Sequence, residues 1–335
     1  MTETGLDIID AELARQFPDA AKTFANAREA AGRAARDIRE TGRLHLLAIG
    51  GSHWVNRLAE PFYRQAGIDA TAHVISEYMR ASLPGPAVRL LTSQSGASGE
   101  ILRYLDTCPE GPLVGLTLSC DSPLGQRVPC VTGHGPAERS YAATRSVAIT
   151  IAQHAAILKA LGADLRGFEA ALKGPDGLPD TREATGVLAG ARAAVFCGRG
   201  NLQGLADGIA LAFMELARVP VLGLEAGMFR HGPFELVDET TATVFFRGEG
   251  PEGDNVDGLA AELVDAGFRP VVLDFSGLPP VAGALTVPVP PACGLAAALH
   301  ALPVAQRIVV DAADRLVPDM GRPLRSTKIT SGEAA

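Results

Sequence analysis

The amino-acid sequence predicts an α/β fold with two doubly wound parallel sheets. Apolar runs of strand length alternate with longer helical patterns, which is typical of parallel β-α-β units. This alternation occurs twice, and the strand candidates are continuously apolar, as expected of strands that helices cover on both faces. The 335 residues suffice for two domains, because a domain usually has roughly 100–200 residues.

The first half opens with a helical pattern and continues with the first set of strands. Five strands are predicted, at 44–49, 71–75, 88–94, 112–118 and near Val128. The pattern over 138–161 predicts a closing helix. A Gly/Pro/Asp cluster at 174–180 breaks both helix and strand and predicts an interdomain linker.

The second half repeats this scheme, which indicates an internal duplication. Its strands are predicted at 193–198, 219–226, 241–246, 270–275 and 284–290, and its last helix at 294–315. We therefore expect a helical leader over 1–40, a first domain over 41–173, a linker over 174–185, a second domain over 186–320 and a tail over 321–335. Right-handed crossovers would complete each layer of helices.

Composition excludes several classes of partner. The net charge of −8 and the pI of about 5.4 argue against a nucleic acid or an anionic membrane as the main partner. No uninterrupted apolar run reaches the roughly 18–20 residues that span a bilayer, and the acidic start lacks a signal-peptide core, so we expect a cytoplasmic protein. The five scattered cysteines form no CxxC pair, and we expect reduced thiols and no metal site.

A loop rich in hydroxyls follows the strand predicted at 88–94. Ser93, Gln94, Ser95 and Ser98 stand directly before a predicted helix, whose N-terminal N–H groups favour anions. The alternative is a purely structural role, in which Ser98 only caps the N-terminus of this helix. Gly51 and Ser52 occupy the equivalent place after the first strand, so both loops should meet at one sheet edge and bind a phosphate.

Motifs along the chain resemble those of the sugar isomerase (SIS) domain superfamily, in the same order. They are AIGGSHW at 48–54, SEY at 76–78, TSQSGASGE at 92–100, ERSYAATRS at 138–146, GRGN at 198–201, FMELA at 213–217 and FRHGPFELV at 229–237. They look like the isomerase half of glutamine-dependent glucosamine-6-phosphate synthase. The resemblance covers roughly residues 10–330 and implies two tandem SIS domains, each a five-stranded parallel sheet sandwiched by helices in a flavodoxin-like three-layer arrangement.

The resemblance also implies the residues that hold the substrate. Those that would bind the sugar phosphate and its hydroxyls are Gly51, Ser52, Ser93, Gln94, Ser95 and Ser98. Glu138 stands where the family places a substrate-contacting glutamate. The family more often has Val-Ala-Ser-Thr-Lys after it, so Tyr141, Ala143 and Arg145 are expected to reshape the sugar pocket.

Three further residues resemble the family's catalytic groups. Glu215 matches the base that moves a proton between carbons 1 and 2, and the alternative for it is a solvated helix residue. His231 matches the histidine that opens the sugar ring, since imidazole exchanges protons near neutral pH, and the alternative is an ordinary turn residue. Lys328 resembles the lysine that forms a Schiff base with the ketose, although its spacing from Arg322 is longer than the family pattern.

These residues leave several reactions open. We expect a stand-alone deaminase or isomerase of glucosamine 6-phosphate, since no glutaminase with an N-terminal cysteine precedes Gly42. The alternatives are a deglycase of 6-phosphorylated ketoamines, a simple aldose–ketose isomerase, and a sugar-phosphate sensor without turnover. The resemblance implies a homodimer with His231 near the subunit interface. No cofactor is expected, because GRGN lacks the full GxGxxG spacing of a dinucleotide loop.

Overall fold

The computed structural model describes residues 3–330, and for residues 251–255 it describes the backbone alone. The described chain divides into two compact units. Unit 1 contains residues 3–9 and 166–322, and unit 2 contains residues 10–165 and 323–330. Helix α1 (Gly5–Asn26) begins in unit 1 and continues in unit 2.

The sheet of unit 2 has five parallel strands. They are β1 (Arg43–Ala48), β2 (Asp69–Val74), β3 (Val88–Thr92), β4 (Leu113–Thr117) and β5 (Cys130–Thr132). Their order is β2-β1-β3-β4-β5. The central strand β1 pairs Leu47 with His73 on one side and with Leu91 on the other. All five strands lie where the apolar runs predict them.

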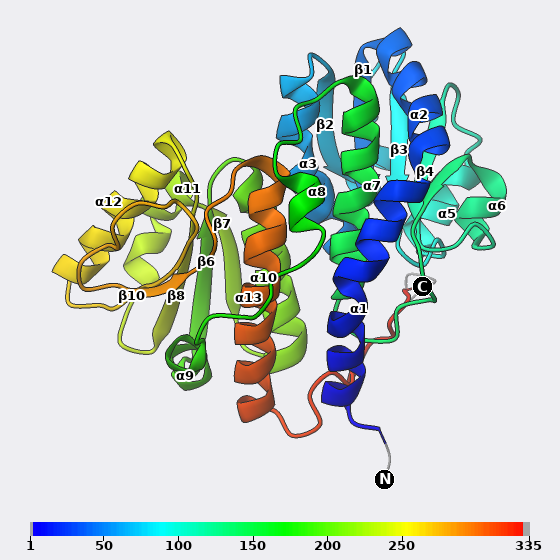
Figure 1. Cartoon of the computed structure of the whole chain (residues 1–335). Coiled ribbons are helices and arrows are strands. Elements are labelled where there is room, and N and C mark those ends of the chain that lie inside the picture. Colours follow the sequence, from blue (N-terminus) through cyan, green and yellow to red (C-terminus); the bar gives the residue numbers. More distant parts are fainter. Residues whose placement is uncertain (1–2, 331–335) are drawn as a thin grey trace. The chain divides into compact units, whose positions relative to one another are not determined.

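Helices cover both faces of this sheet. One face carries α2 (Arg28–Thr41), α3 (Gly51–Gln65) and α7 (Arg145–Leu161), and α2 packs beside α7 in Figure 1. The other face carries α4 (Ile75–Arg80), α5 (Gly99–Asp106) and α6 (Pro123–Arg127). Their apolar side chains form a buried core against β1 and β3, which satisfies the apolar faces of strands and helices together.

Unit 1 has the same topology. Its parallel strands are β6 (Ala193–Gly198), β7 (Val221–Glu225), β8 (Thr241–Arg247), β9 (Val271–Asp274) and β10 (Leu285–Pro288). Their order is β10-β9-β8-β6-β7. Numbered within each unit, both sheets therefore read 2-1-3-4-5, as the predicted duplication requires.

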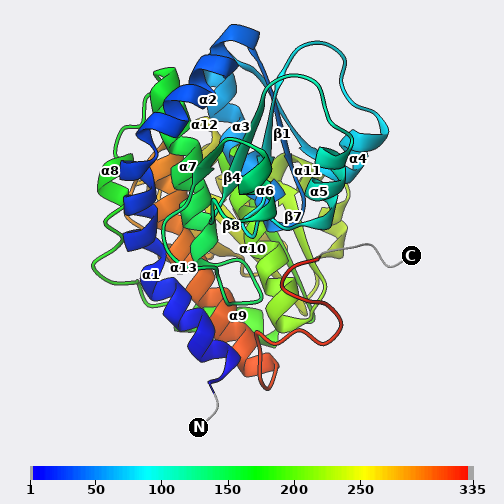
Figure 2. The same cartoon turned by 90° about the vertical axis from the view of Figure 1, so that its right-hand side faces the viewer.

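The helices of unit 1 also form two layers. On one face, α13 (Gly294–Leu316) packs against α8 (Phe168–Ala171), α9 (Arg182–Gly190) and α10 (Asn201–Ala217). The other face carries α11 (Ala226–Arg230), the 3-10 helix η1 (Pro233–Leu236) and α12 (Pro251–Asp265). Figures 1 and 2 both show α10 and α13 side by side. The predicted three-layer α/β fold is thus confirmed in each unit.

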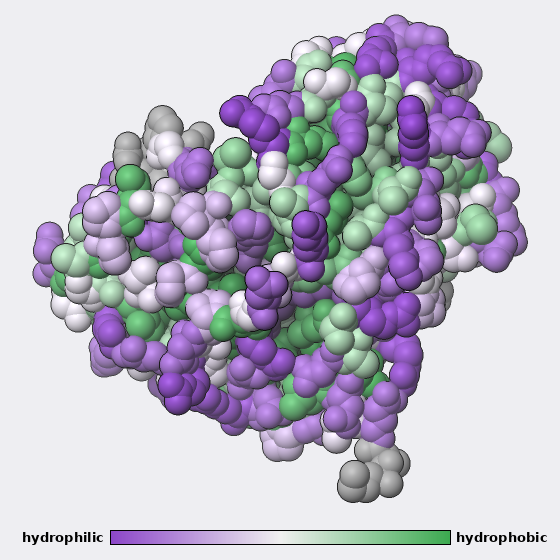
Figure 3. Space-filling model, in the orientation of Figure 1, coloured by the Kyte–Doolittle hydropathy of each residue, from purple (hydrophilic) through white to green (hydrophobic). Residues whose placement is uncertain are grey.

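Within residues 3–330, α13 is the one helix long and apolar enough to cross a membrane, but 83% of its most apolar window is buried inside the protein. Burial of this kind is typical of a core helix. Figure 3 shows hydrophilic residues over much of this face of the molecule, with apolar residues between them. Helices that pack one face on a sheet show this pattern.

The structure differs from the sequence prediction at two helices. The helical pattern of the first 40 residues is two helices, because α1 ends at Asn26 and α2 begins at Arg28. The closing helix predicted over 138–161 begins only at Arg145. The N–H groups of Thr144 and Ser146 bond to the Glu138 carboxylate, so this side chain caps α7 from outside the helix.

Candidate active site

The loop between β3 and α5, residues 93–98, is fixed to the carboxyl edge of the sheet. The Ser93 N–H donates to the Leu116 carbonyl at 2.9 Å, and the Leu118 N–H donates to the Gln94 carbonyl at 2.9 Å. Leu116 belongs to β4, the strand beside β3. The loop therefore lies at the edge where ligands bind in open parallel sheets.

Polar groups gather on this loop. The hydroxyls of Ser93 and Ser98 lie 2.9 Å apart. Ser98 is the N-cap residue of α5, but its side chain makes no capping hydrogen bond. The alternative that this hydroxyl serves only to cap the helix is therefore wrong. The Gln94 Nε2 atom is buried and has no hydrogen-bond partner among residues 3–330. Two hydroxyls and an uncommitted amide donor suit the oxygens of a phosphate.

Gly96 is required by this loop. Its φ is +64°, and a Cβ atom there would lie 2.1 Å from the Ser122 hydroxyl oxygen. We expect Gly96→Ala to destabilise the fold by about 2 kcal/mol or more and to abolish phosphate binding, since both backbone strain and overlap oppose it. Chemical denaturation and calorimetry with inorganic phosphate measure both effects.

Gly177→Ala is the matched control for this variant. A Cβ at Gly177 meets nothing within 4 Å and its φ is not in the left-handed region. This variant should keep the stability and phosphate affinity of the parent chain. Unchanged phosphate binding in Gly96→Ala would contradict the assignment of the loop.

The second predicted loop reaches the same edge. Gly50 has a φ of +58°, and the chain turns there from β1 into α3. Ser52 lies buried in the first turn of α3. A Cβ on Gly51 would stand 3.4 Å from the Ala143 Cβ, so the segment 138–144 lies against this loop. Because β1 and β3 are neighbours, both predicted loops lie at the point where the strand order reverses.

Glu138 and Lys328 form an ion pair beside these loops. The Lys328 Nζ atom lies 2.9 Å from Glu138 Oε2 and 3.3 Å from the Tyr141 carbonyl oxygen. The Glu138 carboxylate also accepts the Ser146 hydroxyl at 2.7 Å and the Ser146 N–H at 2.9 Å. The carboxylate is buried, whereas the lysine is 30% exposed, so a soluble ligand has access to the amine.

The environment of Glu138 keeps its carboxylate ionised. Burial by itself raises the pKa of this carboxyl, but the charge of Lys328 and the hydrogen bonds from Ser146 lower it further than burial raises it. The net pKa therefore lies below the ordinary value. The N-terminus of α7, which Glu138 caps, favours the same charged form.

The tail that carries Lys328 returns to the candidate phosphate loop. The hydroxyls of Tyr141 and Ser326 are hydrogen-bonded. Two residues beyond Lys328, the Thr330 carbonyl accepts the N–H of Gly99, the first residue of α5, at 2.9 Å. The structure thereby brings Lys328 to Glu138 despite the long spacing in the sequence.

The two other predicted catalytic residues belong to unit 1. Glu215 lies half-buried near the end of α10. His231 is exposed directly after α11, and its N–H donates to the Met228 carbonyl at 3.1 Å. Each thus has partial or full access to solvent, as a group that meets a soluble substrate requires.

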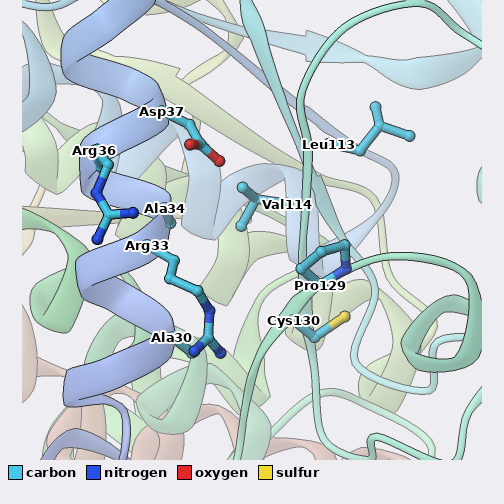
Figure 4. A pocket seen from close by; sticks show the side chains of 9 residues that line it. All are labelled: Ala30, Arg33, Ala34, Arg36, Asp37, Leu113, Val114, Pro129 and Cys130. Carbon is cyan, nitrogen blue, oxygen red and sulfur yellow. The ribbon is translucent and has the colours of Figure 1, made fainter.

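A cavity of about 180 Å³ in unit 2 lies away from these loops. Figure 4 shows Arg33, Arg36 and Asp37 of α2 on one side of it, and Leu113 and Cys130 on the other. Leu113 and Cys130 are the first residues of β4 and β5. The cavity is therefore at the amino ends of the strands, opposite the edge that carries the polar loops.

Comparisons with known proteins agree with this architecture. The tagatose-6-phosphate ketose/aldose isomerase of Escherichia coli superimposes with a TM-score of 0.81 at 21% identity, over 93% of this chain and 95% of that chain. The C-terminal domain of glucosamine-fructose-6-phosphate aminotransferase from Francisella tularensis gives 0.80 at 17% identity, over 92% and 96%. The chain has the tandem SIS-domain fold.

Two further comparisons concern the same fold. Glucosamine-6-phosphate deaminase from Thermotoga maritima matches with a TM-score of 0.74 at 17% identity, over 96% of this chain and 99% of that chain. The glutamine–fructose-6-phosphate aminotransferase (isomerizing) of Caulobacter vibrioides is 28% identical over 231 residues, 62% of this chain. That match spans 38% of the relative's length. No family model matches the chain.

One residue expected to shape the sugar pocket of this SIS fold does not reach it. Arg145 is fully buried, and its guanidinium donates to Glu12 at 2.6 Å and to Asp19 at 3.0 Å, both in α1. Glu12 also accepts the Arg139 N–H at 2.7 Å. Arg145 therefore anchors the segment that carries Glu138 to helix α1, and the expectation that it lines the pocket does not hold.

Two residues that meet at the start of α11, the helix that precedes His231, were not among the predicted site residues. Arg199 Nε donates to Glu225 Oε1 at 2.8 Å, and Glu225 Oε2 accepts the Met228 N–H at 2.9 Å, which caps α11. Burial raises the pKa of Glu225, but the N–H groups of α11 and the charge of Arg199 lower it to below its ordinary value. An acidic residue three positions before Met228 was the available signal, because N-caps accept from that position.

Proposed function

We propose that the chain is a phosphosugar isomerase that acts at carbons 1 and 2, converting glucosamine 6-phosphate to fructose 6-phosphate with release of ammonia. The observation that carries the proposal is the buried, charged Glu138 paired with Lys328 beside two hydroxyl-bearing loops. A carboxylate and an amine next to a phosphate site suit a substrate with both a carbonyl and an amino group. Its SIS-fold relatives include a glucosamine-6-phosphate deaminase and an aminotransferase domain.

Each group has a role in this reaction. Ser52, Ser93, Gln94, Ser95 and Ser98 would hold the phosphate and the sugar hydroxyls. His231 would move the proton that opens the ring. Glu215 would then carry a proton between carbons 1 and 2, because one base on one face of the enediol or enolamine serves both carbons.

Lys328 would bind the carbonyl of the open-chain ketose. Its amine must lose a proton to solvent before it can add to a carbonyl, and Glu138, 2.9 Å away, would hold the amine beside the loops. Addition of the amine and loss of water give an imine. The imine would thus activate the sugar at the carbon next to the one that exchanges its proton.

Borohydride tests this role of Lys328. Reduction in the presence of fructose 6-phosphate should trap a stable secondary amine, so that the peptide containing Lys328 gains the mass of the reduced sugar phosphate. Lys328→Arg keeps the positive charge beside Glu138 but cannot form the imine, and it should show no adduct. An adduct on another residue, or none in the parent chain, would refute the covalent role.

A plain aldose–ketose isomerase is the second candidate. The tagatose-6-phosphate ketose/aldose isomerase of Escherichia coli has this fold, and a Clostridium novyi protein provisionally assigned the same activity matches with a TM-score of 0.84 at 15% identity. The steps at Glu215 and His231 would be the same without nitrogen. Lys328 would then act through its charge alone.

We further propose a homodimer in which the face around His231 meets its equivalent. Exposed apolar side chains support this, on α10, β7, α11 and η1. They are Met214, Leu222, Met228 and Leu236. Strand β7 is an edge of its sheet. Exposed large apolar residues that gather on adjoining elements mark interaction surfaces.

Incubation with glucosamine 6-phosphate, with ammonia and fructose 6-phosphate followed together, tests the proposed reaction. Equimolar appearance of both products is expected. Conversion of ketose to aldose phosphates without ammonia would establish the second candidate. Binding of the sugar phosphate without any turnover would refute both and favour the ketoamine deglycase or the sensor.

A further inference from the structure

Four buried side chains form a hydrogen-bonded series beneath the 93–98 loop, and none of the steps above uses them. The Tyr63 hydroxyl lies 3.1 Å from His154 Nδ1, and His154 Nε2 lies 3.1 Å from Asn56 Oδ1. The Thr92 hydroxyl donates to the same Asn56 oxygen at 2.8 Å. Tyr63, His154 and Asn56 are 0% exposed and Thr92 is 2% exposed.

The Asn56 oxygen determines the direction of these hydrogen bonds. The Asn56 oxygen can only accept, so both the Thr92 hydroxyl and His154 Nε2 must donate to it. Burial keeps His154 neutral by lowering its pKa to about 3, so its Nδ1 atom accepts from the Tyr63 hydroxyl. With the His154 proton on Nε2, the series connects Tyr63 to Thr92 through His154 and Asn56.

Its position links the two candidate phosphate loops. Asn56 is four residues after Ser52 on α3, so the two lie on the same face of the helix. Thr92 is the last residue of β3 and directly precedes Ser93. The bond between Asn56 and Thr92 thus ties the helix that carries Ser52 to the strand end that carries Ser93.

The two polar atoms of the Asn56 side chain differ in how far the fold satisfies them. Its Nδ2 atom is buried and has no hydrogen-bond partner among residues 3–330, which opposes folding. An apolar residue here would remove this unpaired N–H group but would leave the Thr92 hydroxyl and His154 Nε2 without their acceptor. The feature of Asn56 that this position uses is therefore its oxygen, which holds Thr92.

We propose that Asn56 is a positioning residue for phosphate binding. By holding Thr92 it sets the distance between the hydroxyls of Ser52 and Ser93, so that both loops contact one phosphate group. This inference rests on the proposed function, and it adds to it a determinant of ground-state affinity for the phosphate of the sugar. Asn56 itself does not touch the substrate.

Thr92→Val tests the inference, because valine keeps the shape of threonine and removes the donor. We expect the dissociation constant for inorganic phosphate and the KM for glucosamine 6-phosphate to rise about tenfold, as loss of one buried hydrogen bond allows. The kcat should stay within about twofold, since chemistry at carbons 1 and 2 is unaffected. Thr92→Ser restores a hydroxyl and should recover both constants.

Thr150→Val is the matched control. Thr150 is equally buried in unit 2, and its hydroxyl bonds only within its own helix, to the Ser146 carbonyl at 2.8 Å. It should leave phosphate affinity unchanged. Trp54, the single tryptophan, reports by its fluorescence whether unit 2 of each variant is folded. Tyr63→Phe weakens the far end of the series and gives a second test, with a smaller loss of phosphate affinity.

The outcomes separate the two levels of the proposal. Parent affinity in both Thr92→Val and Tyr63→Phe would overturn the positioning role while the proposed function stands. A fall in kcat equal to the rise in KM, without recovery in Thr92→Ser, would also overturn it. If the parent chain binds neither inorganic phosphate nor glucosamine 6-phosphate, the proposed function fails and the positioning role fails with it.

Discussion

Glu215→Gln should lower turnover about 10²–10⁴-fold, because general acid–base catalysis by a single group contributes that much. Glutamine fills the same space on α10 and lacks only the basic oxygen. Sugar-phosphate affinity should stay within about twofold, since the proposed phosphate contacts lie on the loops of unit 2. Steady-state kinetics and calorimetry with glucosamine 6-phosphate measure both constants.

Glu183→Gln is the control for this variant. Glu183 is an exposed helix glutamate of unit 1 that pairs with Arg269, and its loss should change neither constant. If Glu215→Gln keeps the turnover of the parent chain, Glu215 is not the base. It would then be the solvent-exposed helix residue that the sequence also allows.

The second large effect is acid instability of unit 2. Burial lowers the pKa of His45 and His53 to about 4, helped by His73 and Arg43 near the first and by Arg57 near the second. Burial lowers the pKa of His154 to about 3. The unfolded chain binds protons at these groups below about pH 6.5, whereas the folded unit does not, so stability is lost as the pH falls.

At pH 5 each of these histidines should reduce the free energy of unfolding by about 2 kcal/mol relative to pH 7. Urea unfolding followed by the fluorescence of Trp54 measures this in unit 2. His154→Gln cannot titrate and should make the pH dependence shallower by about that amount, whatever its stability at pH 7. A pH dependence as steep in His154→Gln as in the parent chain would contradict the account.

The strands were the most predictable part of the fold. Their apolar runs are continuous because helices cover both faces of each sheet, and such runs need no knowledge of distant residues. The start of α7 was not predictable in this way. Its cap is the side chain of Glu138, seven residues before the helix begins. Helix propensity over 138–144 cannot predict a cap that lies so far from the helix.

Parts of the candidate site depended on contacts between distant residues. Lys328 meets Glu138 across 190 residues, which the local spacing around Arg322 did not reveal. Asn56 and His154 are 98 residues apart, and no local pattern around either residue indicates that their side chains meet. The hydroxyl-bearing loops, in contrast, were predictable, because glycine and serine directly after an apolar strand indicate a ligand-binding loop without knowledge of distant residues.

The central claim is proton transfer at carbons 1 and 2 of a sugar phosphate. Incubation with fructose 6-phosphate in D₂O, followed by NMR, tests it most directly. The account predicts that deuterium enters at carbon 1 with the parent chain and that Glu215→Gln slows this exchange at least about a hundredfold. Tight binding of fructose 6-phosphate with no exchange at either carbon would contradict it.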